Sequence, residues 1–118
     1  MTGRDDVRAA LRRTRIAVVA DVPDGEAHRV EAFGVPIALV NIAGDFYAIG
    51  DTCSHGEYSL SAGEVWPDEC EIECPKHGSM FSLRTGDALT LPATRPVPVF
   101  TVERDGDDLY VIAAEDPT

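Results

Sequence analysis

Two short segments decide the fold of this chain: Cys53-Ser54-His55-Gly56 and Cys74-Pro75-Lys76-His77-Gly78. The whole chain contains three cysteines and three histidines, and these two segments hold two of each. Thiolate sulfur and imidazole nitrogen together favour zinc or an iron–sulfur cluster over hard cations such as magnesium. The segments therefore predict a metal centre at a place where two loops meet.

The spacing of the ligands separates the two kinds of metal centre. A structural zinc site usually takes a pair of like ligands from each segment, such as two cysteines a few residues apart. Here each segment supplies one sulfur and one nitrogen, and a long stretch separates His55 from Cys74. We expect Cys53 and Cys74 to share one iron and His55 and His77 to hold the other, which is the mixed ligation of a Rieske [2Fe–2S] centre. A structural zinc module for protein interaction stays the alternative.

The sequence around these segments resembles small Rieske-type ferredoxins, the electron carriers of bacterial ring-hydroxylating dioxygenases. The resemblance rests on Ile72 to Phe81, on Arg84-Thr85-Gly86 and on Leu91-Pro92-Ala93, and it extends from about Ile16 to Ala113. It implies the all-β Rieske fold, in which an antiparallel β-sandwich base carries a small inserted cluster-binding subdomain. It also implies an electron-transfer protein and not an enzyme. Similar ferredoxins accompany iron–sulfur cluster assembly genes in some bacteria, so that role stays open.

Five residues near the ligands gain a role from the resemblance. Gly56 and Gly78 follow the histidines and are expected to let the backbone turn tightly, with amide groups directed at the cluster sulfurs. Ser79 matches a serine near the cluster sulfurs, whereas Phe81 lacks the hydroxyl of a tyrosine found in high-potential Rieske proteins. Pro92 lies in the third loop that covers the cluster in this family. The missing hydroxyl predicts a potential in the lower part of the Rieske range of about −150 to +300 mV.

Two positions separate the chain from the high-potential Rieske proteins of respiratory and photosynthetic complexes. Those proteins carry one further cysteine in each ligand loop, and the two cysteines form a disulfide. The corresponding residues here are Tyr58 and Lys76, so we expect no loop disulfide. The remaining cysteine, Cys70, is expected to pack in the core, and Lys76 is expected to be solvated.

Length and hydrophobic pattern favour a single all-β domain. With 118 residues and 44% hydrophobic content, the chain can form a modest core without disulfides. Apolar runs between turn residues predict strands at 16–22, 27–33, 35–42, 46–49, 97–102 and 109–113. The nearly continuous apolar run at 35–42 indicates a strand covered on both faces. We expect residues 16–115 to form one Rieske domain, with its cluster-binding subdomain at about 51–86.

Two further expectations concern the start of the chain and its tryptophan. Residues 1–15 are predicted to be an N-terminal extension, in which a short helix over residues 4–13 places Val7 and Leu11 on one face. Trp66 is expected to bury its ring and so anchor the stretch between the two ligand segments.

Charge and composition narrow the choice of partners and compartment. The formal net charge of −11, from 21 acidic and 10 basic residues, disfavours nucleic acid and anionic membranes and favours a basic protein partner. The lack of a long apolar run or secretory leader and the unpaired Cys70 favour the cytoplasm. The resemblance implies two transient partners, a flavin-dependent ferredoxin reductase that supplies an electron and a terminal non-haem iron oxygenase that receives it.

Overall fold

The computed structural model describes residues 11–54, 56–76 and 78–114, which form nine strands and two short 3₁₀ helices. The strands are β1 (Leu11–Val18), β2 (Ala27–Ala32), β3 (Val35–Ile42), β4 (Asp45–Gly50), β5 (Glu64–Trp66), β6 (Glu71–Glu73), β7 (Met80–Ser82), β8 (Val99–Asp105) and β9 (Asp108–Ala114). The helices are η1 (Val19–Asp21) and η2 (Leu60–Ala62). No helix within these residues has the length and apolar character needed to cross a membrane.

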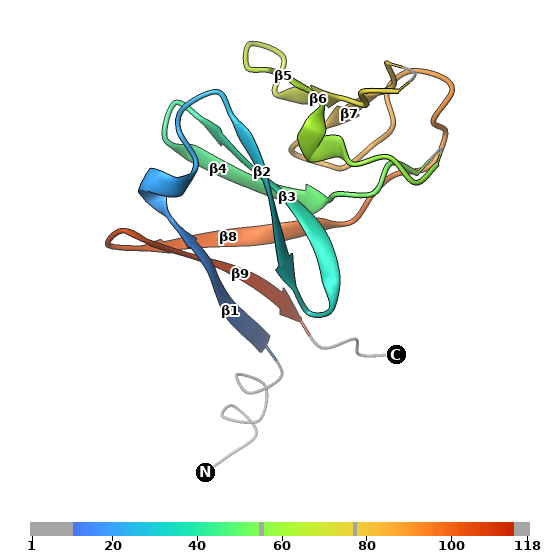
Figure 1. The fold of residues 1–118 in the computed structure, drawn as a ribbon. Coiled ribbons are helices and arrows are strands. Elements are labelled where there is room, and N and C mark those ends of the chain that lie inside the picture. Colours follow the sequence, from blue (N-terminus) through green and yellow to red (C-terminus); the bar gives the residue numbers. More distant parts are fainter. Residues whose placement is uncertain (1–10, 55, 77, 115–118) are drawn as a thin grey trace.

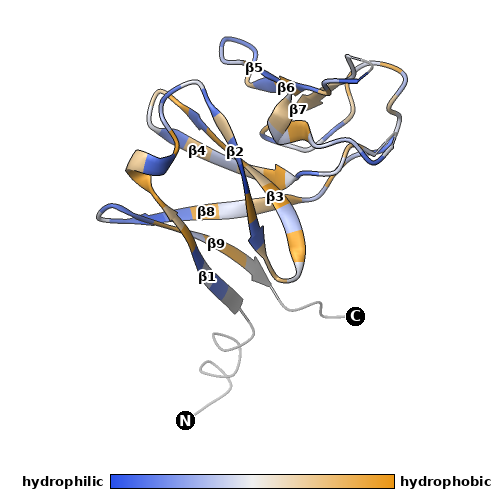
Figure 2. Cartoon of the chain, viewed as in Figure 1, coloured by the Kyte–Doolittle hydropathy of each residue, from blue (hydrophilic) through white to orange (hydrophobic). Residues whose placement is uncertain are grey.

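Six strands form one antiparallel sheet in the order β1-β9-β8-β4-β3-β2. β4 and β8 pair over a short register, with Ala48 opposite Phe100 and Ile49 opposite Val99, and the sheet divides there into two halves (Figure 1). The halves enclose a first core, which includes Ala32, Ile37, Leu39, Ala48, Leu109 and Val111. Figure 2 shows hydrophobic colours along β9 and hydrophilic colours at the β8–β9 turn. The base is therefore the predicted antiparallel β-sandwich.

The strands β5-β6-β7 form a second, three-stranded antiparallel sheet. A second core lies between this small sheet and the other face of β3 and β4, and it includes Ala38, Val40, Ile49, Leu60, Ile72, Phe81 and Val97. Consecutive residues of β3 thus alternate between the two cores, and residues 37–40 are all fully buried. The prediction of a strand covered on both faces is confirmed.

Glycine-containing turns connect the strands of the first two hairpins. Phe33 and Gly34 join β2 to β3, with φ angles of 56° and 79°. Ala43 and Gly44 join β3 to β4, with φ angles of 54° and 90°. Two successive positive φ angles are the backbone of a type I′ turn, whose twist matches that of the paired strands.

The start of the first strand differs from the prediction. β1 begins at Leu11 and not at Ile16, and it ends at Val18, where η1 follows. The prediction of a helix is wrong for residues 11–13, because the backbone of these residues pairs with β9 and places Leu11 opposite Ala114. Long-range pairing outweighs the weak helical preference of so short a segment. The rest of the predicted helix lies outside the described residues, and the division into extension and domain otherwise stays a prediction.

Shortening a side chain on the doubly buried part of β3 is expected to destabilise the protein far more than shortening one at its exposed end. Leu39→Ala leaves a cavity in the first core and is expected to lower the free energy of unfolding by about 2–5 kcal/mol. Val35→Ala, at a residue that is 40% exposed, is expected to cost about 0.5 kcal/mol or less. Urea unfolding followed by circular dichroism measures both, and equal losses would contradict the two-sided packing of β3.

Candidate metal centre

Three loops gather at one end of the molecule (Figure 1). Loop 1 (residues 51–59) follows β4 and carries Cys53, and loop 2 (residues 74–79) joins β6 to β7 and carries Cys74. Loop 3 (residues 88–96) lies between β7 and β8. The strands that precede loops 1 and 2 both contribute to the second core, so the packing of that core positions the two cysteines.

Loops 1 and 2 close by the same backbone hydrogen bond. The amide of Cys53 donates to the carbonyl of Tyr58 at 2.9 Å, and the amide of Cys74 donates to the carbonyl of Ser79 at 2.8 Å. In both loops the bond joins the cysteine to the residue five positions later. The two loops are therefore similar turns, each with its cysteine at the start, as expected for segments that bind one object from two sides.

The glycines that follow the predicted histidines complete these turns. The amide of Gly56 donates to the carbonyl of Cys53 at 3.2 Å, and the amide of Gly78 donates to the carbonyl of Cys74 at 3.0 Å. These two amides close the loops, and the expectation that amide groups of the loops are directed at the cluster sulfurs stays a prediction. Gly78 has a φ of +77°, a conformation that favours glycine. A Cβ at Gly56 would lie 3.1 Å from the ring of Tyr58.

Both predicted cysteine ligands lie in the second core. Cys53 is 2% exposed and Cys74 is 1% exposed, and both belong to the apolar cluster between the base and the small sheet. His55 and His77 lie outside the described residues, and their assignment as ligands stays a prediction. Within residues 11–54, 56–76 and 78–114, no group of three or more His, Cys, Asp or Glu side chains is arranged to hold a metal ion.

Loop 3 is hydrogen-bonded to both cysteine loops. The hydroxyl of Ser54 in loop 1 donates to the carbonyl of Arg95 at 2.5 Å. The amide of Ala93 donates to Oγ of Ser79 in loop 2 at 3.1 Å. Ser79 is fully buried, and its hydroxyl keeps one proton to donate after accepting from Ala93. Pro92 is exposed and directly precedes the residue that anchors the loop.

A buried carboxylate orders the segment around loop 1. Asp51 is 2% exposed and accepts hydrogen bonds from Oγ of Ser59 at 2.5 Å and from the amide of Ser61 at 2.8 Å. Its carbonyl accepts from the amide of Leu60 at 2.6 Å. The sequence patterns described above do not predict this role. The available signal is an aspartate two residues before Cys53, with two serines a short distance downstream.

Cys70 packs in the second core, as predicted, and is 4% exposed. A hydrogen bond with Cys70, together with burial, raises the pKa of the Tyr47 phenol. Tyr47 belongs to β4 and Cys70 precedes β6, so the contact joins the base to the small sheet. Phe81 of β7 is fully buried in the same core.

Trp66 contradicts the prediction of a buried ring. It is 40% exposed, and its indole nitrogen donates to Oε1 of Glu73 at 3.0 Å. β5 is an edge strand of the small sheet, and Val65 packs against the second core. Because successive strand residues point to opposite faces, Trp66 lies on the outer face of this sheet.

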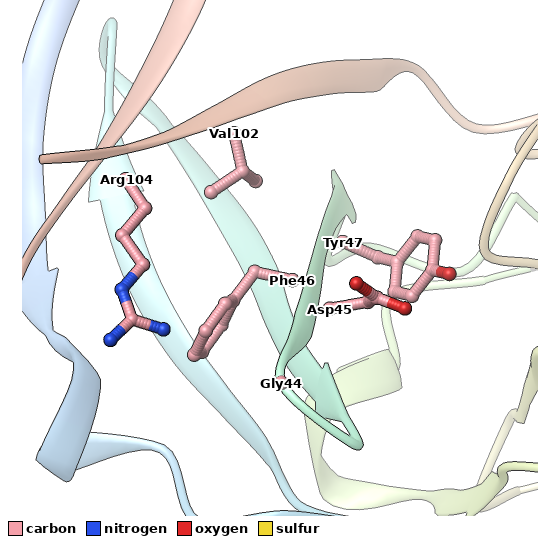
Figure 3. Close-up of a pocket in the computed structure, with 6 residues that line it drawn as sticks. All are labelled: Gly44, Asp45, Phe46, Tyr47, Val102 and Arg104. Carbon is pink, nitrogen blue, oxygen red and sulfur yellow. The ribbon is translucent and has the colours of Figure 1, made fainter.

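A groove in the base is separate from the three loops. It has a volume of about 360 Å³ and lies where β4 and β8 diverge (Figure 3). In Figure 3 the ring of Tyr47 points away from Phe46 and Arg104. The groove is lined by Gly44, Asp45, Phe46, Tyr47, Val102 and Arg104. This lining contains no cysteine or histidine, so the thiol chemistry lies in loops 1 and 2 and not here.

The fold and the paired cysteine loops define a class of small β proteins that carry a metal centre at one end. The model of the Rieske [2Fe-2S] domain family matches residues 12–101, and the chain belongs to this family. Its cofactor is accordingly a Rieske [2Fe–2S] cluster, which replaces the zinc alternative.

The similar proteins indicate which kind of Rieske protein this chain is. The chain is 46% identical over 101 residues to the 3-phenylpropionate/cinnamic acid dioxygenase ferredoxin subunit of Escherichia coli strain K12, an alignment that covers 86% of this chain and 93% of the relative. The ferredoxin of carbazole 1,9a-dioxygenase from Nocardioides aromaticivorans IC177 has a TM-score of 0.81 and 32% identity, over 84% of this chain and 95% of that chain. A chain in the complex of reduced oxygenase and oxidized ferredoxin of carbazole 1,9a-dioxygenase has a TM-score of 0.79 and 36% identity, over 90% and 97%. The protein is a Rieske-type ferredoxin, an electron carrier.

Removing the buried carboxylate beside loop 1 is expected to destabilise the protein. Asp51→Ala removes the buried acceptor of the Ser59 hydroxyl and the Ser61 amide, so we expect the free energy of unfolding to fall by about 1–3 kcal/mol. Asp24→Ala is the matched control, because Asp24 is an exposed aspartate that also accepts a hydrogen bond, from the amide of Ala43. We expect the control to lose about 1 kcal/mol or less. Urea unfolding compares the two, and a larger loss in the control would refute the role of Asp51.

Proposed function

We propose that this ferredoxin carries single electrons from a flavin-dependent reductase to a terminal non-haem iron oxygenase that hydroxylates aromatic rings. The observation that carries the proposal is the pair of matching loops that hold Cys53 and Cys74 in one buried core of a Rieske domain. The 46% sequence identity to a dioxygenase ferredoxin subunit supports an oxygenase as the acceptor of the electron. A carrier of single electrons needs a donor, and flavins are cofactors that can supply electrons in this form.

We infer that Cys53 and Cys74 would hold one iron of the cluster, and that His55 and His77 would hold the other. The cysteines fit this assignment, because two thiols buried in the same core supply the two sulfur ligands of a Rieske centre. With two thiolates and two neutral imidazoles the oxidised centre is close to neutral on formal counting. When bound, the cluster supplies one-electron chemistry at a moderate potential.

The chain's own residues would exclude water from the cysteine side and stabilise charge there. Leu60, Ile72 and Phe81 are fully buried in the core that contains both cysteines. The hydroxyl proton of Ser79 is available to an acceptor in this buried region, and hydrogen bonds to cluster sulfur raise the potential. Because the cysteines face the core, we expect electrons to leave from the histidine side. A cytoplasmic location is supported by Cys70 and Cys74, which form no disulfide.

Acidic residues on the outer face of the small sheet support the proposal that the redox partner is basic. Glu64 lies opposite Glu73, and Trp66 lies opposite Glu71. Like charges directly opposite each other in a sheet are destabilising, and a partner that carries Lys or Arg would relieve this repulsion. The arginine–carboxylate ion pairs of the described residues lie elsewhere, on Arg13, Arg15 and Arg29. We expect this face to attract the positive surface of a redox partner.

Replacing either predicted histidine ligand with cysteine is expected to lower the reduction potential. His55→Cys and His77→Cys each add thiolate charge next to the cluster, and the potential should fall by about 0.2–0.5 V from its Rieske value. Protein-film voltammetry measures the shift, with iron and sulfide analysis to show that the cluster is present. Arg84→Met, which changes the net charge by the same amount at an exposed residue outside the three loops, is the control and is expected to shift the potential much less. An unchanged potential in a loaded histidine variant would show that the ligand assignment is wrong.

Neutralising the outer face of the small sheet is expected to slow electron transfer to the acceptor. Glu64→Gln combined with Glu71→Gln should reduce the rate constant at low ionic strength about threefold or more, and should flatten its dependence on salt. The matched control, Asp105→Asn with Asp107→Asn, removes the same charge from the β8–β9 turn, away from the three loops (Figure 1). Stopped-flow oxidation of the reduced ferredoxin by the terminal oxygenase of the E. coli K12 relative measures both. Equal effects would assign the attraction to net charge and not to this face.

A further inference from the structure

Loops 1 and 2 meet through an aromatic ring and a cation. Nζ of Lys76 in loop 2 lies 5.7 Å from the centroid of the Tyr58 ring in loop 1. A Lys ammonium within about 6 Å of a ring centroid is attracted by the negative face of the ring. Tyr58 is 39% exposed, and Lys76 is exposed. The predicted solvated lysine is therefore exposed but also in contact with the opposite loop.

We propose that Tyr58 and Lys76 form a cation–π clip that holds loops 1 and 2 closed around the cluster. The inference rests on the proposed function, because it takes the cluster to be bound between these loops. The clip assigns Tyr58 and Lys76 the role of positioning residues, which act on the bound iron through the loops that carry its ligands.

Both partners of the clip sit on turns that the backbone already fixes. The carbonyl of Tyr58 accepts the amide of Cys53, and the Tyr58 ring lies where a side chain at Gly56 would be. Lys76 lies inside the turn that the bond between Cys74 and Ser79 closes. A contact between two turns that are already fixed loses less conformational entropy than a contact between mobile segments. More of the favourable cation–π free energy therefore remains to stabilise the closed state.

The clip completes a set of contacts among the three loops. Loop 1 is joined to loop 3 through Ser54 and Arg95, and loop 2 is joined to loop 3 through Ser79 and Ala93. The contact of Tyr58 with Lys76 connects the remaining pair of loops. Opening loop 1 or loop 2 away from the others then breaks the clip together with one of the hydrogen bonds.

The clip lies where high-potential Rieske proteins are expected to have their disulfide, at the positions of Tyr58 and Lys76. A disulfide can be opened by thiol reductants, whereas an attraction between a cation and a ring cannot. The clip therefore keeps the loops closed in a reducing compartment, at the cost of a weaker connection.

The test is the rate at which the loaded, reduced ferredoxin loses iron to an excess of ferrozine under anaerobic conditions. Tyr58→Leu and Lys76→Met each remove one side of the clip and are each expected to speed iron loss about two- to fivefold. The double variant should lose iron no faster than the faster single variant, because the contact is already broken. Tyr58→Phe keeps the ring and Lys76→Arg keeps the cation, and both should stay close to the wild-type rate.

A matched control removes a similar contact from the base. Cζ of Arg13 lies 3.6 Å from the centroid of the Tyr110 ring, on β1 and β9 and away from the loops, so Tyr110→Leu should leave the rate of iron loss unchanged. If the rate increase in the double variant equals the product of the increases in the two single variants, the two side chains act independently, and this result would overturn the proposed clip. Fast loss from Lys76→Arg would also overturn it, because the cation is retained. If the wild type binds iron without the paramagnetic signal of a reduced Rieske centre, the proposed function fails instead.

Discussion

Strand β3 packs apolar side chains into two cores at once, and this double burial fixes the small sheet and the three loops on the base. Ile37 and Leu39 enter the first core, whereas Ala38 and Val40 enter the second. A shift of one residue in the pairing of β3 would exchange these pairs between cores, and the different side-chain volumes oppose it. β4 pairs with β3 so that Gly50 lies opposite Ile37, and loop 1 begins at the next residue. The register of these two buried strands therefore determines where the chain leaves the sheet and enters the loop that carries Cys53.

The cysteine loops depend on the backbone more than on neighbouring side chains. Each loop is closed by an amide of its cysteine and again by an amide of its glycine, so four main-chain bonds set the direction of two thiols. Loop 3 adds one bond to each cysteine loop through a serine hydroxyl. Loops that are closed by their own hydrogen bonds are preorganised, and a preorganised site loses less free energy in ordering its ligands. This is useful for a carrier whose cluster must change charge without a large movement of its ligands.

The sequence predicts most of this frame because its signals are local. Apolar runs mark the basal strands, turn residues between the runs mark the hairpins, and the scarce cysteines and histidines mark the loops. The errors come from tertiary context. The start of β1 depends on pairing with Ala114, near the other end of the sequence, and the exposure of Trp66 follows from the edge position of β5. The role of Asp51 requires Ser59 and Ser61 to fold back on it, and the spacing of one aspartate and two serines is too common a pattern to predict that fold by itself.

The pairing of β1 with β9 also has a consequence for how this domain combines with others. Leu11 lies opposite Ala114, so the polypeptide enters and leaves the base at neighbouring points, on the side away from the three loops (Figure 1). A neighbouring module, attached before β1 or after β9, would extend from that side and leave the three loops uncovered. The same geometry would allow the whole unit to be inserted within a longer polypeptide, because its two connections need to span only the spacing between adjacent strands.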